Sequence, residues 1–225
     1  MPEERVPTGN PDFDRLLGGG YEPGTIIQMY GEPASGKSSV CILSAVQCLR
    51  TGRAVIYIDT EGFSIERFRQ VAGTGAETLA EKLYIYEPTG FDQQGVIIAG
   101  LDDVVREKDI GLIVVDSVTA LYRMELEKGK DVLQKLSRQV LLLLGLGKRY
   151  QIPVIITNQV YMDMARNTYA GLGGTALEHI SKTIVRFSRR DGAVRRACLT
   201  KHRSLPADTC FDFEITGDGI RGIAP

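Results

Sequence analysis

The chain lacks several features that would place it in a specialised class. Among its 225 residues there is no tryptophan, and no apolar run approaches the ~20 residues that a membrane-spanning helix needs. The first ten residues, MPEERVPTGN, contain no apolar stretch of the kind found in secretion signals. Internal repeats and low-complexity tracts are also missing. We therefore expect a globular, cytoplasmic protein with a buried core.

Zinc-ligand spacing is absent as well. The four cysteines, Cys41, Cys48, Cys198 and Cys210, form no C-x-x-C pair. Cys41 and Cys48 fall in an apolar segment with helical spacing, which favours packing in the core. Disulfide bonds stay open at this stage, because nothing in the sequence requires them in a cytosolic protein.

The net charge is small, but the charged residues are unevenly distributed. The net charge of −1 argues against a protein that binds nucleic acid over its whole surface. Residues 1–179 carry a net charge of −5, residues 180–204 carry +7, and residues 205–225 carry −3. The basic segment predicts a surface that faces phosphate groups. A solvated hairpin with long charged side chains explains the same composition, and both interpretations stay open.

Short β-branched apolar runs alternate with helical segments. We predict buried strands over residues 25–31, 54–59, 83–88, 112–117 and 153–160. Helices are expected over residues 37–50, 64–72, 92–107 and 131–149. This alternation predicts an α/β fold with a mostly parallel twisted sheet flanked by helices. A C-terminal antiparallel extension is predicted from a hairpin and a further strand, over residues 183–189, 194–202 and 211–216.

The strongest motif is GEPASGKSS, which matches G-x-x-x-x-G-K-[ST] between a predicted strand and a predicted helix. Its glycines let the backbone wrap around a polyphosphate, and the backbone N–H groups stabilise the negative charge. We expect Lys37 to reach the β- and γ-phosphates of ATP, and the Ser38 hydroxyl to bind Mg²⁺. The nucleotide-binding residues predicted from the motif are Gly31, Glu32, Pro33, Ala34, Ser35, Gly36, Lys37, Ser38 and Ser39.

Three further polar residues lie at the ends of predicted strands or just after them, at the edge where open α/β sheets bind ligands. Asp116 ends the run LIVVDS and is expected to hold Mg²⁺ together with Ser38. Glu61, in YIDTEG, is expected to orient or deprotonate the attacking water. Gln159, in TNQV, is expected to sense the γ-phosphate through a neutral amide. The predicted catalytic residues are therefore Glu61, Lys37 and Gln159.

Four segments resemble, in their order and spacing, the ATPase core of RecA-type recombinases: GEPASGKSS, YIDTEG, LIVVDSVTALYR and VIITNQV. Their sequences are similar to those of the archaeal and eukaryotic strand-exchange branch. The resemblance covers nearly the whole chain and implies a RecA-like P-loop ATPase fold. The N-terminal helical DNA-binding domain and the phenylalanine linker of the longer recombinases have no counterpart. The chain thus resembles the short archaeal recombinase paralogs, and we expect one RecA-like domain over residues 1–225.

The resemblance also implies roles for single residues. Arg67 matches the arginine that stacks on adenine, and Arg123 matches the start of the first DNA-binding loop. His179 matches a histidine near the nucleotide at a subunit interface. A plain surface position on a helix is the alternative for Arg67. Packing on a helix is the alternative for His179. The mixed charges that follow Arg123 weaken the prediction of a DNA contact there.

Lys201 and Arg203 lie two residues apart on a predicted strand, so both side chains are expected on one face. They resemble the K-x-R residues that hexameric helicases and clock proteins present to the γ-phosphate of a neighbouring subunit. Such trans-acting groups stabilise charge in the transition state, as an arginine finger does. Contact with DNA and plain solvation are the alternatives.

The resemblance implies an ATP- and Mg²⁺-binding protein of homologous recombination and DNA repair, with slow DNA-dependent ATP hydrolysis. The expected partners are single-stranded DNA, with double-stranded DNA as a second candidate, the main archaeal recombinase, other repair proteins and a second copy of the chain. No membrane is expected, and the location is nucleoid-associated. DNA phosphates are expected to meet Arg123, Arg166, Arg189, Arg190, Arg195 and Arg196. An ATP-switched mediator with negligible hydrolysis and a clock- or helicase-like ring ATPase remain alternatives.

Overall fold

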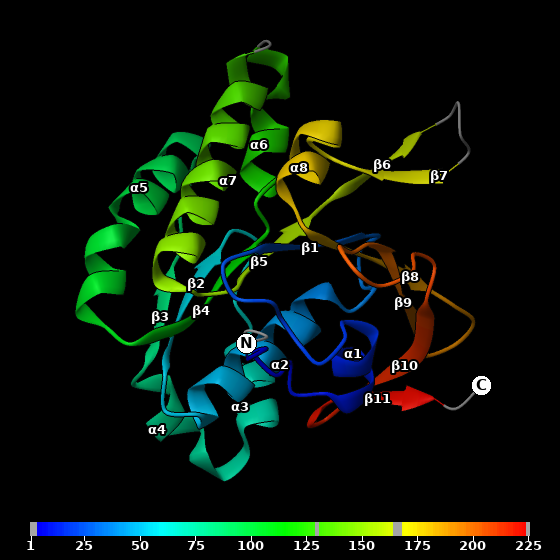
Figure 1. The fold of residues 1–225 in the computed structure, drawn as a ribbon. Helices are drawn as coiled ribbons and strands as arrows, with labels where there is room; N and C mark the ends of the chain where they lie inside the picture. The colour runs from blue at the N-terminus through cyan, green and yellow to red at the C-terminus, as the bar shows by residue number, and fades with distance from the viewer. Residues whose placement is uncertain (1–3, 129–130, 164–167, 224–225) are drawn as a thin grey trace.

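The computed structural model describes residues 4–128, 131–163 and 168–223. Within this part of the chain, nine strands form one sheet in the order β11-β10-β9-β8-β1-β5-β4-β2-β3 (Figure 1). From β8 to β3 all neighbours pair in parallel, and from β8 to β11 they pair antiparallel. The strands are β1 (Ile26–Gly31), β2 (Ala54–Asp59), β3 (Leu83–Tyr86), β4 (Ile110–Asp116), β5 (Val154–Asn158), β8 (Thr183–Arg189), β9 (Val194–Lys201), β10 (Cys210–Thr216) and β11 (Gly219–Ile223).

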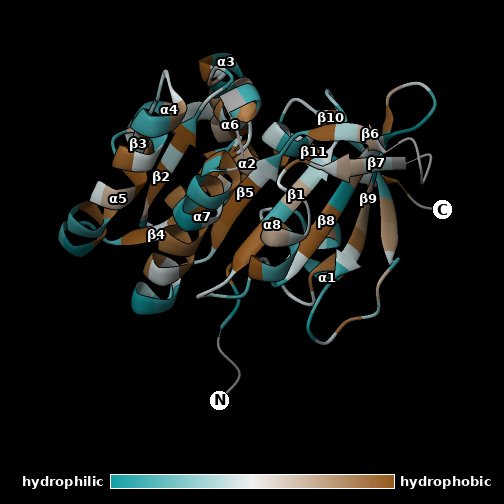
Figure 2. Ribbon diagram, turned by 90° about the horizontal axis from the view of Figure 1, so that it is seen from above, coloured by the Kyte–Doolittle hydropathy of each residue, from teal (hydrophilic) through white to brown (hydrophobic). Residues whose placement is uncertain are grey.

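Helices cover both faces of this sheet, because the side chains of its central strands are apolar on both sides (Figure 2). Along β2, Val55 and Tyr57 join one core while Ile56 and Ile58 join the other, as the alternation of a strand requires. The first core is covered by α1 (Pro11–Leu16), α2 (Lys37–Arg50), α3 (Ile65–Ala72) and α4 (Ala76–Ala80). The second is covered by α5 (Phe91–Glu107), α6 (Ala120–Glu125), α7 (Asp131–Tyr150) and α8 (Gly174–Ile180). The predicted α/β fold with a mostly parallel sheet is confirmed.

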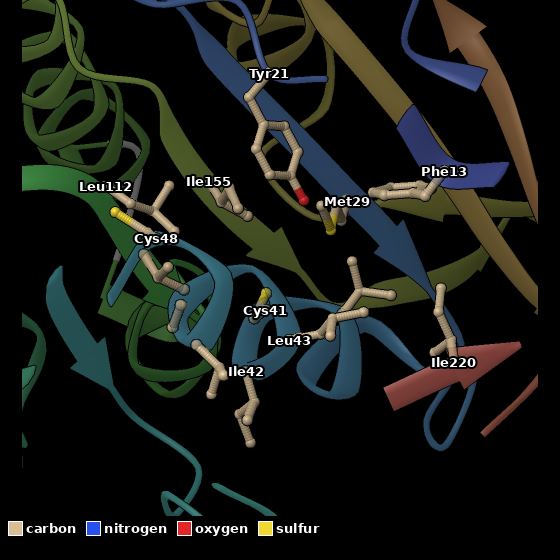
Figure 3. Packing of buried hydrophobic residues seen from close by; sticks show 14 of the residues in the cluster. Phe13, Tyr21, Met29, Cys41, Ile42, Leu43, Cys48, Leu112, Ile155 and Ile220 are labelled. Atoms are coloured by element: carbon tan, nitrogen blue, oxygen red, sulfur yellow. The ribbon is translucent and has the colours of Figure 1, made fainter. Parts of the chain in front are cut away.

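Helix α2 lies deep in the first core, where it packs beneath the central strands (Figure 3). Cys41 is fully buried on this helix and Cys48 is 2% exposed, and both are free thiols, so the prediction that they pack in the core is confirmed. Tyr21 and Met29 close the core from the sheet side. Burial of one such large apolar side chain contributes about 1.5–3 kcal/mol. This packing fixes the first turn of α2, which carries the candidate phosphate-binding residues.

The C-terminal part of the sheet is antiparallel, as predicted, but it contains one strand more than expected. Strand β11 pairs with β10 along its whole length. Cys198 on β9 faces Cys210 on β10, and the two form a disulfide. The predicted strand over residues 153–160 is wrong in extent, because β5 ends at Asn158.

A second, small sheet follows β5. Strand β6 (Val160–Asp163) pairs antiparallel with β7 (Thr168–Gly171), and Figure 1 shows this hairpin projecting from the main body at the upper right. Its side chains Tyr161, Met162 and Tyr169 are each more than 40% exposed. The hairpin therefore begins one residue after Gln159 and carries an apolar, solvent-facing surface.

The helices that the structure describes include none that is both long and apolar enough to span a membrane. The 20-residue α7 is amphipathic, because Leu136 and Leu143 are buried whereas Lys135 and Arg138 are exposed. This pattern fits a helix that covers one face of a sheet.

Candidate functional site

The loop between β1 and α2 has the backbone of a phosphate-binding loop. Gly31 and Gly36 have positive φ angles of 153° and 103°. A Cβ atom on Gly31 would lie 2.0 Å from the carbonyl oxygen of Phe187, so a side chain cannot be accommodated there. Gly36 caps α2 and leaves the first N–H groups of the helix directed at the loop. The loop therefore presents a concave surface of backbone donors.

Lys37 stands in the first turn of α2, where its Nζ donates to the carbonyls of Gly31 and Glu32 at 2.8 and 3.0 Å. Burial lowers the pKa of Lys37, and the charges of Asp116 and Glu61 oppose that shift. The lysine side chain therefore lies over the concave side of the loop and bonds to the start of the loop. A polyphosphate placed there offers stronger, charged acceptors than the two carbonyls.

A cavity of about 330 Å³ lies beside this loop. Gly31 and residues 33–39 form one wall. Glu61, Asp116 and Gln159 form the other, from the ends of β2, β4 and β5. The structure thus brings the predicted residues together at one site, although Glu32 is turned aside and accepts a bond from the backbone N–H of Arg189 at 2.8 Å.

Glu61 and Gln159 are in direct contact on the same wall of the cavity. The Gln159 amide nitrogen donates to the Glu61 carboxylate at 2.6 Å. The neighbouring Asn158 has another task, since it is fully buried, donates to the carbonyl of Leu172 and accepts from Thr119. Gln159 therefore faces the site, whereas Asn158 anchors the segment after the β6–β7 hairpin.

Asp116 forms the floor of the cavity and is only 5% exposed. One carboxylate oxygen accepts from the Tyr57 hydroxyl at 2.9 Å, and the other accepts from the Thr157 hydroxyl at 2.5 Å. Sequence reasoning missed these two residues, because each is a single hydroxyl-bearing residue inside an apolar run, to which no motif gives a role. Tyr57 lies two residues before the end of its strand, and Thr157 is the next-to-last residue of its strand. A hydroxyl group so close to the ligand-binding end of a strand is the signal that would have found them.

The site fits a nucleoside triphosphate with Mg²⁺. Ser35 Oγ and Gln159 Oε1 are buried atoms on the cavity wall that have no hydrogen-bond partner among the described residues. Such atoms are expected to meet a bound ligand or water. In the described ranges no group of three or more His, Cys, Asp or Glu side chains is placed to hold a metal ion. An ion here would be held by Ser38, Asp116, phosphate oxygens and water, which suits Mg²⁺.

Arg67 has a different set of contacts from the predicted adenine stack. Its guanidinium donates to the carbonyls of Thr216 and Gly219 at 2.6 and 2.7 Å, in the turn between β10 and β11. The nearby Ile215 lines the cavity, but Arg67 itself does not. In this structure Arg67 ties α3 to the β10–β11 turn, and adenine stacking stays a prediction.

The four arginines of the basic segment that are predicted to contact DNA divide into three groups. Arg189 and Arg190 are exposed near the end of β8. Arg196 forms a two-pronged ion pair with Asp212 at 2.6 and 2.7 Å, which lowers the pKa of that carboxyl. Arg195 lines the phosphate-loop cavity, and its Nε donates to the carbonyl of Ala34 at 3.3 Å. The segment is thus not one uniform phosphate-facing surface.

Two other residues predicted to contact DNA can be placed only in part. Arg123, on α6, lines the same cavity as Lys37 and Glu61. Arg166 lies outside the described residues. Contact of either residue with DNA stays a prediction.

The predicted trans-acting residues do not share one strand face. Strand β9 ends at Lys201, and Arg203 lies beyond it in an ion pair with Glu22 at 2.9 Å, so the expectation of two parallel side chains on one strand is wrong. Lys201 donates to the carbonyls of Glu178 and Ser181 at the end of α8. With His179 it lines a second cavity of about 380 Å³. That cavity shares no lining residue with the first.

Comparison with known proteins agrees with this geometry. The Rad51 family profile matches residues 4–223. The chain belongs to the Rad51 family. Similar relatives are named "DNA repair and recombination protein RadB": that of Methanoculleus marisnigri is 56% identical over 99% of this chain and 100% of its own length, and that of Archaeoglobus fulgidus is 40% identical over 96% and 97%.

A solved structure supports the same family assignment. The crystal structure of the RadB recombinase superposes with a TM-score of 0.86, at 35% identity, over 97% of this chain and 100% of that one. The predicted resemblance to RecA-type recombinases, and among them to the short archaeal paralog RadB, is therefore confirmed. The RecA-like fold with an antiparallel C-terminal extension is confirmed with it.

Proposed function

We propose that the chain is an ATP- and Mg²⁺-binding protein of DNA repair and homologous recombination, which hydrolyses ATP slowly in response to DNA and assists the main archaeal recombinase. The observation that carries this proposal is the 2.6 Å hydrogen bond between Gln159 and Glu61 in the wall of the P-loop cavity. It joins a carboxylate suited to activating water to the amide just before the β6–β7 hairpin. Nucleotide state and the position of that hairpin are therefore physically connected.

The phosphate-binding side uses three residues of this chain. Bound Mg²⁺ would neutralise charge on the β- and γ-phosphates during in-line transfer. Lys37 exchanges its bonds to the loop carbonyls for bonds to those phosphates. Ser38 and Asp116, which both line the cavity, would hold the ion.

The opposite wall prepares the attacking water. The Glu61 carboxylate accepts a proton or a hydrogen bond from water aligned with the γ-phosphorus. Gln159 orients that carboxylate through one amide N–H, and its second N–H is available to the γ-phosphate. After phosphate release, the amide loses one acceptor and the β6–β7 hairpin is free to move with it.

DNA is assigned to the surface around the exposed arginines Arg189 and Arg190, together with Arg166, through phosphate contacts. The positions of Arg123 and Arg195 in the cavity wall favour contact with the nucleotide for these two residues. If Lys201 and His179 act on a nucleotide, it is that of a second copy, since their cavity is separate from the P-loop cavity. We place these functions in one RecA-like domain over residues 1–225, acting in the cytoplasm at the nucleoid.

The proposal is tested by ATP hydrolysis measured with and without single-stranded DNA, and with and without the main recombinase. We expect low basal turnover that single-stranded DNA raises several-fold. Tight ATP binding with negligible, DNA-insensitive turnover would replace the ATPase by an ATP-switched mediator. A discrete ATP-dependent hexamer would favour a ring ATPase, although the loss of the paired K-x-R geometry counts against it.

A further inference from the structure

The carboxylate of Asp116 is held by two hydroxyl groups from the strands on either side of β4. Tyr57 comes from β2 and Thr157 from β5, and each donates to a different oxygen of Asp116, at 2.9 and 2.5 Å. Both side chains are essentially buried, at 1% and 0% exposure. The carboxylate is thus fixed in rotation as well as in position.

This arrangement leaves capacity for a further ligand. A carboxylate offers about four lone-pair directions. Two are taken by the hydroxyls, and the remaining two are available to the cavity that Asp116 lines.

The Tyr57 side chain is held in place on two sides. Its hydroxyl donates to Asp116. Its ring packs edge-on against Phe63 with centroids 4.9 Å apart, which limits its movement.

We propose that Tyr57 and Thr157 are positioning residues that orient Asp116 toward the metal ion of the P-loop site and so set the Mg²⁺ requirement for nucleotide binding. The inference rests on the proposed function and goes beyond it by assigning the residues that act on Asp116. Outer groups of this kind typically change metal affinity by roughly 10–100-fold when they are removed.

The test is the Mg²⁺ concentration at half-maximal binding of a fluorescent ATP analogue (mant-ATP). Tyr57→Phe removes only the hydroxyl and keeps the contact with Phe63. We expect it to raise the Mg²⁺ midpoint about 10-fold, and Thr157→Val to do the same. The matched control is Tyr21→Phe, because Tyr21 is equally buried and its hydroxyl bonds Ser44 at 2.7 Å in the same core, away from the cavity lining. Its Mg²⁺ midpoint should equal that of the wild type.

A double variant shows whether Tyr57 acts through Asp116. In an Asp116→Asn background, Tyr57→Phe should change the Mg²⁺ midpoint less than twofold, because the orienting bond no longer has its charged acceptor. An unchanged midpoint in both single variants, or a shift as large in Tyr21→Phe, would overturn the inference. Wild-type protein that fails to bind mant-ATP with Mg²⁺ would instead refute the proposed function.

Discussion

At the scale of single residues, the site depends on contacts that sequence motifs predict only in part. Four sequence motifs predicted that five residues lie at strand and helix ends, and the structure brings all five to one cavity: Lys37, Ser38, Glu61, Asp116 and Gln159. These motifs are informative because a parallel sheet brings the carboxyl ends of its strands to one edge.

Other contacts could not be predicted. The Tyr57 and Thr157 hydroxyls lie inside apolar runs, where strand register decides which residues meet. Arg67 is a surface arginine by sequence, and its bonds to the β10–β11 turn depend on a contact across more than 140 residues. Local patterns carry no information on such pairings.

The residue that separates binding from hydrolysis is Glu61. Glu61→Gln should leave ATP affinity within about twofold of wild type, since the side chain keeps its shape and its contact with Gln159. Turnover should fall about 100-fold or more, because the general base is lost. Steady-state hydrolysis and equilibrium binding on the same preparation measure both. The control is Glu66→Gln, in the first turn of α3, and normal turnover in Glu61→Gln would move the base elsewhere.

A variant of Arg123 distinguishes a contact with the nucleotide from a contact with DNA. Arg123→Ala should weaken ATP binding about 5–10-fold and ADP binding less, because a guanidinium lining the cavity near Glu61 favours the additional phosphate. Titrations of both nucleotides give the comparison. A loss of DNA affinity with unchanged ATP affinity would contradict this placement and restore the predicted DNA contact.

At the scale of elements, the sequence predicted the buried strands well and the short amphipathic pieces poorly. Strands β1, β2 and β4 are recognisable because they are buried on both faces and therefore continuously apolar. Strand β11, with the sequence GIRGI, is too short and too rich in glycine for such a signal. The predicted strand continues through the polar residues 157–159 to Val160, because the sequence there contains no glycine or proline to separate β5 from the β6–β7 hairpin.

The loop from β9 to β10 should be sensitive to acid. His202 Nδ1 accepts from the backbone N–H groups of Ser204 and Leu205, both at 3.2 Å. Partial burial, and after it the charge of Arg5, lower the pKa of His202. The unfolded chain therefore binds more protons in the interval between this lowered pKa and the ordinary value of ~6.5. Stability from this group is present above ~6.5 and is lost as pH falls through that interval.

His202→Asn isolates this effect, because asparagine offers an acceptor near the position of Nδ1 and does not titrate. The melting temperature of the wild type should fall more steeply than that of the variant between pH 7.5 and 5.5. Thermal denaturation at half-unit steps of pH checks it. Parallel pH profiles would mean that His202 does not titrate within the folded loop.

At the scale of the whole molecule, the basic segment of residues 180–204 includes β8 and β9, at the antiparallel end of the sheet, and α5 lies at the other end (Figure 1). Composition predicted this concentration of charge, but not that Arg196 and Arg203 are neutralised by Asp212 and Glu22. Both acids lie outside the basic segment in the sequence. The extent of a DNA-facing surface therefore depends on which arginines the fold leaves exposed.

The double variant Arg189→Ala/Arg190→Ala should weaken binding of single-stranded DNA and reduce the slope of log affinity against log salt by about 1.4, or ~0.7 for each lost phosphate contact. Fluorescence anisotropy over a range of salt concentrations measures the slope. Arg106→Ala is the control, since Arg106 lies on α5 and pairs with Asp103. An unchanged slope in the double variant would exclude this surface from the DNA contact.

The central claim is that the P-loop cavity binds ATP with Mg²⁺, and equilibrium binding of ATP to the wild type and to Lys37→Ala tests it most directly. We predict saturable, Mg²⁺-dependent binding of one ATP per chain in the wild type. In Lys37→Ala the affinity should fall at least ~10-fold while the folded structure is retained, because charge-assisted bonds to phosphate are lost. No saturable binding by folded wild-type protein, or equal affinity in the two proteins, would contradict the account.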